Sequence, residues 1–209
     1  MSTRVAIAGA AGRMGRTLVE ACSQLDGLEC TAALEYAGHD AMGVDVGTLA
    51  GTGANGAIIG SDLRAIVDAF DVLVEFSLPA PTIEHLLICA ELGRPMVIGT
   101  TGMDTEQRAA IALAGERVPV VFAPNMSVGV NLTFKLIEMA AKVLGDSVDI
   151  EIIEAHHRHK VDAPSGTAVR MGEILASALG RDLAECAVYG REGHTGPRDR
   201  RTIGFETIR

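Results

Sequence analysis

Residues 4–22 read RVAIAGAAGRMGRTLVEAC, and this stretch decides the fold. Its apolar start predicts a short buried strand, and its end carries apolar residues at helical spacing. Between them, Gly9, Gly12 and Gly15 follow a G-x-x-G-x-x-G pattern. A second strand is expected over residues 28–35, LECTAALE. The chain therefore opens with the strand–helix–strand unit that is typical of a parallel sheet.

A glycine turn between a strand and a helix predicts a place for a pyrophosphate. Glycines let the backbone turn tightly and approach the phosphates, whose charge is then stabilised by the free N–H groups at the helix N-terminus. Glu35 follows at the end of the second strand, where an acid can bind a ribose diol. The pattern predicts a dinucleotide site, and an ordinary tight turn is the structural alternative.

Further along the chain, strands and helices continue to alternate up to about Asn125. Such alternation predicts a doubly wound, Rossmann-type α/β sheet. Residues 38–60 are expected to form a glycine-rich loop with one short strand near residues 57–59. Two strand exits, GTTG at 99–102 and APNM at 123–126, are further candidate ligand loops, because open parallel sheets bind ligands at that edge.

Beyond Met126 the pattern changes. We predict a nucleotide-binding domain over residues 1–126 and a smaller α+β domain over residues 127–209. The last residues, RTIGFETIR, alternate like a strand and are followed by no turn. The second domain is therefore expected to be incomplete at its C-terminal end.

The composition and net charge of the chain disfavour several classes of binding partner. The 209 residues are 48% apolar and only 3% aromatic, and the formal net charge is −9. An acidic chain repels phosphate backbones, so no nucleic-acid partner is expected. No apolar run approaches the ~18 residues of a membrane span, and no secretory pattern opens the chain. The four scattered cysteines indicate buried thiols in a reducing, cytoplasmic location rather than a zinc site or disulfides.

Residues 154–168 read EAHHRHKVDAPSGTA and concentrate cations in this acidic chain. Three interpretations compete for the cluster from His156 to Lys160. A metal site is disfavoured because three near-adjacent histidines do not converge easily. A solvated basic turn is common. The third interpretation is a dicarboxylate site that also supplies a proton, since His and Lys can act as general acids and the PSGT turn opens a helix that attracts anions.

Several segments together resemble one enzyme family. These are VAIAGAAGRMGR (5–16), VIGTTG (97–102), NMSVGVN (125–131), EIIEAHHRHKVDAPSGTA (151–168) and CAVYGREGHTGPR (186–198). The pattern is similar to that of the 4-hydroxy-tetrahydrodipicolinate reductases, also called dihydrodipicolinate reductases, and it covers the whole chain. The resemblance implies reduction of a cyclic imine dicarboxylate with NADH or NADPH, in the diaminopimelate route to lysine, by a homotetramer.

The resemblance also assigns residues. His156 and Lys160 are implied as proton donors, and the substrate is contacted by His157, Gly166 and Thr167. The pyrophosphate and ribose are implied to lie on Gly9, Ala10, Ala11, Gly12, Arg13, Met14 and Glu35. The nicotinamide is implied to lie on Gly99, Thr100, Thr101, Ala123, Pro124, Asn125 and Met126. Arg158 and His159 receive no role, and no metal is implied.

Two departures from the family pattern matter. Tyr36 and Leu78 stand where many members carry arginines that meet the phosphate of NADPH, so NADH is expected to be preferred. Members also continue well past Arg209, which leaves the tetramer and the activity open. The alternatives are another NAD(P)H-dependent reductase of small acids and an inactive, truncated nucleotide-binding module.

Overall fold

The computed structural model describes residues 2–209, which fold into two compact units. The first ends at Ala123, and the second runs from Pro124 to Arg209. The first unit contains, in chain order, β1 (Thr3–Ala8), α1 (Arg13–Gln24), β2 (Leu28–Leu34), α2 (Val46–Ala50), β3 (Ile59–Gly60), the 3-10 helix η1 (Arg64–Ala69), β4 (Val72–Glu75), α3 (Pro79–Leu92), β5 (Met96–Ile98), α4 (Thr105–Ala114) and β6 (Val120–Phe122).

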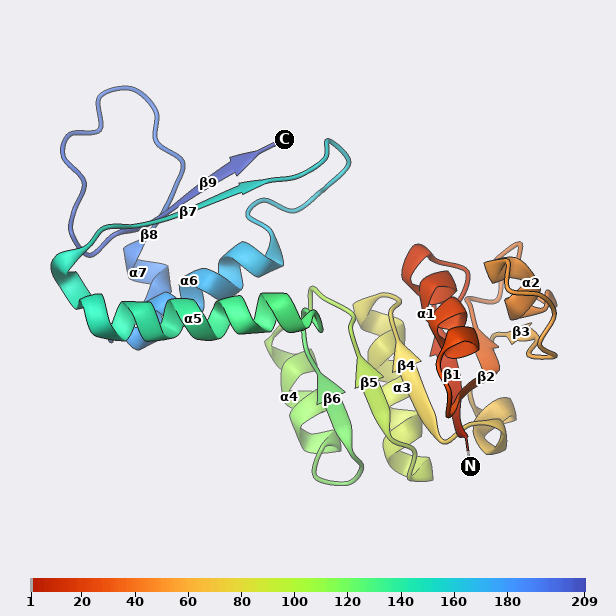
Figure 1. Cartoon of the computed structure of the whole chain (residues 1–209). Coiled ribbons are helices and arrows are strands. Elements are labelled where there is room, and N and C mark those ends of the chain that lie inside the picture. Colours follow the sequence, from red (N-terminus) through yellow and green to blue (C-terminus); the bar gives the residue numbers. More distant parts are fainter. Residues whose placement is uncertain (1) are drawn as a thin grey trace. The chain divides into compact units, whose positions relative to one another are not determined.

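The six strands of the first unit form one parallel sheet in the order β3-β2-β1-β4-β5-β6 (Figure 1). After β1, the chain adds β2 and β3 on one side of the sheet. It then adds β4, β5 and β6 on the other side of β1. The neighbouring ends of β1 and β4 are thus the topological switch point, where open α/β sheets bind their ligands. The predicted doubly wound class is confirmed.

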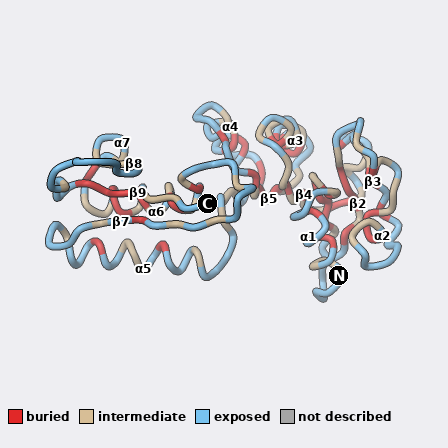
Figure 2. Tube along the Cα trace, turned by 90° about the horizontal axis from the view of Figure 1, so that it is seen from above, coloured by how far each residue is buried: buried red, intermediate tan, exposed pale blue. Residues whose placement is uncertain are grey.

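Each face of this sheet has its own apolar core. On one face, Val19 of α1 and Val46 of α2 pack with Ile7 and Ile59. The other face buries residues of α3 and α4 against the strands. Figure 2 shows that the buried residues of this unit concentrate along the strands. Helices on both faces explain why the strand sequences are continuously apolar.

The predicted glycine-rich loop at residues 38–60 contains a helix that the periodicity did not indicate. Asp45 caps α2 by accepting a hydrogen bond from the Thr48 N–H at 2.8 Å. Its carboxylate also accepts from the N–H groups of Asn55 and Gly56, and these bonds hold the pKa of Asp45 below its usual value. One acid therefore organises a loop in which glycines obscure the helical pattern. After this loop, Arg64–Ala69 form the 3-10 helix η1.

The second unit is a parallel three-stranded sheet in the order β7-β9-β8, covered by helices. Its elements are α5 (Val128–Leu144), the 3-10 helix η2 (Gly145–Ser147), β7 (Ile150–Ala155), α6 (Gly166–Ala178), α7 (Leu183–Cys186), β8 (Ala187–Tyr189) and β9 (Ile203–Ile208). Ile152, Ile203 and Phe205 pack against α6. The C-terminal strand was predicted, whereas α7 and β8 were not.

Candidate functional site

The turn between β1 and α1 admits only glycine at two points. Gly9 has a φ of +73°, and a Cβ there would lie 2.9 Å from the carbonyl oxygen of Phe76. A Cβ on Gly15 would lie 2.2 Å from the Gly9 carbonyl oxygen. Helix and turn therefore approach more closely than any side chain allows. This geometry fits the close backbone approach that a pyrophosphate requires.

The N-terminus of α1 is open to an anion. Gly12 is its N-cap and offers no side-chain cap, and the first N–H groups of a helix lack intrahelical acceptors. The half-buried Glu35 lies at the same turn, because its Oε1 accepts a hydrogen bond from the Ala11 N–H at 2.9 Å. The structure thus brings the predicted ribose acid next to the predicted phosphate loop. The exposed Arg13 and Met14 start the helix.

The GTTG segment lies at the exit of β5, beside the exit of β4. The Gly99 N–H donates to the Glu75 carbonyl at 3.0 Å, and the Phe76 ring occupies the space that a Cβ on Gly99 would need. Thr100 is buried, with its hydroxyl 3.0 Å from that of Thr82, whereas Thr101 is exposed. Thr100 can therefore offer a ligand its main chain only.

The segment from Ala123 to Met126 crosses the division between the two units. The Ala123 N–H donates to the Ile98 carbonyl at 3.2 Å, and the Asn125 side-chain oxygen accepts from the Ser127 N–H at 2.9 Å. Pro124 and Met126 are exposed. The segment is thus tied to β5 at its start and to the first turn of α5 at its end.

In the second unit, the basic segment links β7 to α6. The His156 N–H donates to the Ile208 carbonyl at 3.1 Å, which extends the pairing of β7 with β9 by one residue. Ser165 caps α6 by accepting from the Ala168 N–H at 3.2 Å. Gly166 and Thr167 are therefore the first residues of this helix, where free N–H groups favour an anion.

Glu154 is a functional candidate that the sequence reasoning missed. Its carboxylate accepts hydrogen bonds from the N–H and hydroxyl of Ser165 and from the Thr207 hydroxyl, and its Oε2 lies 3.6 Å from Nδ1 of His156. Partial burial raises the pKa of Glu154, but the hydrogen bonds and the nearby His156 outweigh it and lower the pKa overall. This single carboxylate connects the predicted proton donor with the start of α6. No distinct signal in the sequence indicated it, because Glu154 is one of two glutamates in β7, the other being Glu151.

Lys160 already binds a carboxylate of the chain. Its Nζ lies 2.7 Å from Oδ1 of Asp162, and its side chain is only 22% exposed. The Lys160 ammonium and, to a smaller extent, the Gly166 N–H hold the pKa of Asp162 below its usual value. A carboxylate therefore lies between two groups predicted to bind or protonate the substrate.

The remaining members of the basic segment are exposed. The His157 Nδ1 accepts from the His159 N–H at 3.2 Å, and the two rings lie 6.0 Å apart. Arg158 has a long contact, of 3.5 Å, with the His159 ring. His157 thus lies beside the predicted proton donors, and Arg158 forms no ion pair with an acid among residues 2–209.

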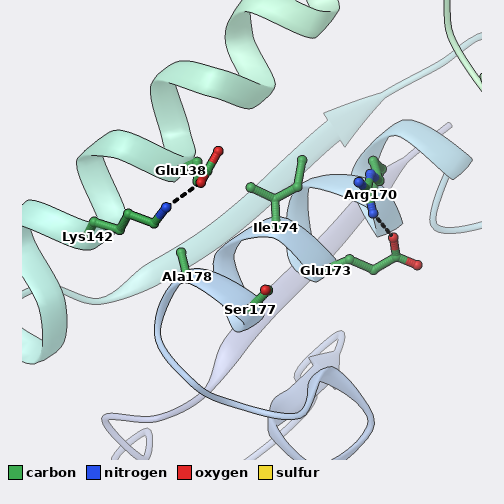
Figure 3. Close-up of a pocket in the computed structure, with 7 residues that line it drawn as sticks. All are labelled: Glu138, Lys142, Arg170, Glu173, Ile174, Ser177 and Ala178. Atoms are coloured by element: carbon green, nitrogen blue, oxygen red, sulfur yellow. Dashed lines mark hydrogen bonds and ion pairs between the residues drawn. The ribbon is translucent and has the colours of Figure 1, made fainter.

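Two further features bear on the candidate site. Within residues 2–209, no three acidic, histidine or cysteine side chains converge as metal ligands would. A hollow of about 310 Å³ lies between α5 and α6, lined by two ion pairs, Glu138–Lys142 and Arg170–Glu173 (Figure 3). None of the predicted site residues line it.

No helix in the described part of the chain combines the length and apolar character needed to cross a membrane.

The fold and the glycine turn define a dinucleotide-binding protein with a Rossmann-type first domain. Comparison with known families is more specific. The model described as "Dihydrodipicolinate reductase, N-terminus" matches residues 3–126, and the one described as "Dihydrodipicolinate reductase, C-terminus" matches residues 129–209. The chain belongs to the dihydrodipicolinate reductase family, and the predicted resemblance is confirmed.

Individual relatives agree. The 4-hydroxy-tetrahydrodipicolinate reductase of Alkalilimnicola ehrlichii is 60% identical over 100% of this chain and 78% of its own length. That of Pseudomonas fluorescens is 58% identical over 99% of this chain and 77% of its own length. Among solved structures, the dipicolinate-bound dihydrodipicolinate reductase of Paenisporosarcina sp. TG-14 is 28% identical, with a TM-score of 0.72 over 100% of this chain and 78% of that one. The family is one of NAD(P)H-dependent oxidoreductases.

Proposed function

We propose that this chain reduces 4-hydroxy-tetrahydrodipicolinate, a cyclic imine dicarboxylate, in the diaminopimelate route to lysine. The observation that best supports the substrate class is the position of Asp162. Its carboxylate is held by the Lys160 ammonium and lies near the Gly166 N–H. A substrate carboxylate offers the same chemistry and can replace it at these groups.

The proposed roles follow from the positions of the side chains. When bound, the coenzyme supplies the hydride. His156 and Lys160 supply the proton that the reduced ring requires at the carbon next to the one that receives the hydride. Glu154 fixes Ser165 by hydrogen bonds and lies near His156, with its Oε2 3.6 Å from Nδ1 of that ring, so that one carboxylate lies beside both the proposed proton donor and the start of α6. His157, Gly166 and Thr167 bind the substrate.

The coenzyme is proposed to lie along the carboxyl edge of the first sheet. The turn Gly9–Met14 receives the pyrophosphate, and Glu35 receives the ribose. The main chain of Gly99–Thr101 and Ala123–Met126 receives the nicotinamide. The close packing at Gly9 and Gly15 and the bond from the Ala11 N–H to Glu35 support this assignment.

The function is tested by following NADH oxidation with freshly generated hydroxy-tetrahydrodipicolinate. We expect turnover with this substrate and much slower turnover with a panel of acyclic imino and keto acids. Turnover of a different acid only would identify another small-acid reductase. NADH binding without turnover of any of them would identify a nucleotide-binding module.

In the same assay, NADH is expected to give a higher kcat/KM than NADPH. Tyr36 and Leu78 are 68% and 69% exposed at the coenzyme edge and carry no charge, while Glu35 repels a 2′-phosphate. A Tyr36→Arg variant is expected to shift the ratio toward NADPH by about tenfold, because it adds a charge-assisted hydrogen bond. A wild type that prefers NADPH would contradict the proposal.

The second unit is proposed to assemble a cytoplasmic homotetramer through its sheet. Helix α6 covers one face, and the other face exposes apolar side chains, with Ile153 70% and Ile208 56% exposed. Light scattering is expected to give about four times the 21.8 kDa chain mass, and Ile153→Arg should lower that value. A monomeric wild type would refute this assembly.

All four cysteines are unpaired, which is compatible with a reducing compartment.

A further inference from the structure

A carboxylate with no assigned role is buried at the centre of the coenzyme edge. Glu75 is the last residue of β4 and is 0% exposed. Its Oε2 lies 2.6 Å from Nδ1 of His85 on α3, whose side chain is 17% exposed. A buried acid is costly unless it is paired and hydrogen-bonded. At this distance the carboxylate and the imidazole share a hydrogen bond, which pairs the buried acid with a side chain of α3.

The other oxygen of Glu75 holds a loop. Oε1 accepts a hydrogen bond from the Ser77 N–H at 3.0 Å, so the carboxylate fixes the first turn after β4. The Glu75 carbonyl accepts from the Gly99 N–H at 3.0 Å and thereby fixes the exit of β5. One residue therefore anchors two adjacent loops, with its side chain for one and its main chain for the other.

The anchored loop, Phe76–Leu78, lies between the other two loops of the coenzyme edge. On one side, the carbonyl oxygen of Phe76 and the backbone of Ser77 pack against Gly9, at 2.9 Å and 3.4 Å from the position of its absent Cβ. On the other side, the Phe76 ring covers Gly99. A shift of this loop would therefore move into either the glycine turn or the GTTG segment.

We propose that Glu75 and His85 are positioning residues for coenzyme binding, which act by fixing the Phe76–Leu78 loop between the glycine turn and the GTTG segment. His85 holds the Glu75 carboxylate, and the carboxylate holds the Ser77 N–H. The pair does not touch the coenzyme. This inference rests on the proposed function in so far as that function places a nicotinamide dinucleotide at this edge.

The test separates positioning from simple stabilisation. The double variant Glu75→Leu/His85→Leu replaces the whole pair by apolar side chains, a change that often preserves stability while it removes the anchor of Ser77. His85→Asn retains a donor near the Nδ1 position. Asp71→Asn is the matched control, because Asp71 lies at the opposite end of β4 and accepts from the Arg4 N–H at 2.8 Å, away from the coenzyme edge. The measurements are NADH Kd by coenzyme fluorescence, which no Trp of the chain obscures, the apo-protein Tm, and KM and kcat.

We expect the double variant to raise the NADH Kd about tenfold, with kcat at saturating NADH changed less than about twofold. His85→Asn should stay within about threefold of the wild-type Kd, and Asp71→Asn should lower Tm without changing Kd. A folded double variant with the wild-type Kd overturns the proposal. If the double variant fails to fold, His85→Leu alone is measured. If that variant also fails, the pair supports the core rather than the loop, and the proposal is wrong. A wild type that binds no NADH would instead refute the proposed function.

Discussion

Replacement of Lys160 or His156 by alanine is expected to lower kcat by about 10²–10⁴-fold, the usual contribution of a positioned general acid. Both residues lie in the segment between β7 and the N-terminus of α6, and each has a carboxylate nearby. His156 lies 3.6 Å from Glu154, and Lys160 lies 2.7 Å from Asp162. The double variant should lose little more than the worse single variant, because groups that act as a unit are not additive.

The control lies within the same segment. Arg158 and His159 are exposed and have no assigned role, so Arg158→Ala and His159→Ala should retain kcat within about twofold of the wild type. All four variants should bind NADH with the wild-type Kd, since the substitutions lie outside the first unit, which contains the glycine turn. An unchanged kcat in both His156→Ala and Lys160→Ala would exclude these residues as the proton donors.

The α/β class of the first unit could be predicted because its hydrophobic pattern and its turn residues indicate the same alternation of strands and helices. The GAAGRMG turn lies between an apolar strand and an amphipathic helix, and all three patterns indicate the same strand–turn–helix arrangement. At the start of α4, Asp104 and Gln107 form a capping box, a pairing of residues three apart, and both of its hydrogen bonds form. Local signals were sufficient for the strand–turn–helix start of this unit, but not for α2, whose cap by Asp45 lies among glycines.

The supports of the candidate sites could not be predicted, because they depend on long-range contacts. Glu154 meets Ser165 across 11 residues and Thr207 across 53. Glu75 reads as part of a buried strand, and only the fold brings His85 to it. Thr100 lies in a predicted ligand loop, and only the fold brings its hydroxyl to that of Thr82 on α3. The candidate catalytic and binding residues could be predicted from the sequence. The residues that position them could be identified only in the structure.

Gly15→Ala is expected to abolish measurable NADH binding, with an increase in Kd of at least about 100-fold. The added Cβ would lie 2.2 Å from the Gly9 carbonyl oxygen and 2.6 Å from the Ala10 Cα, so the backbone of the turn must move. Overpacking of this kind costs about 1–3 kcal/mol of stability, and here the strain falls on the turn that approaches the pyrophosphate. Tm should decrease as well, by several degrees.

Gly129→Ala is the matched control for this change. Gly129 also lies in the first turn of a helix, α5, but the nearest atom to its added Cβ would be the Ser127 Oγ at 3.8 Å, which is ordinary contact. Its Tm and NADH Kd should remain at the wild-type values, because alanine suits a helix better than glycine does. If Gly15→Ala binds NADH within about threefold of the wild type, then the turn tolerates a displaced backbone. In that case the close approach of α1 to Gly9 would not be what forms the phosphate site.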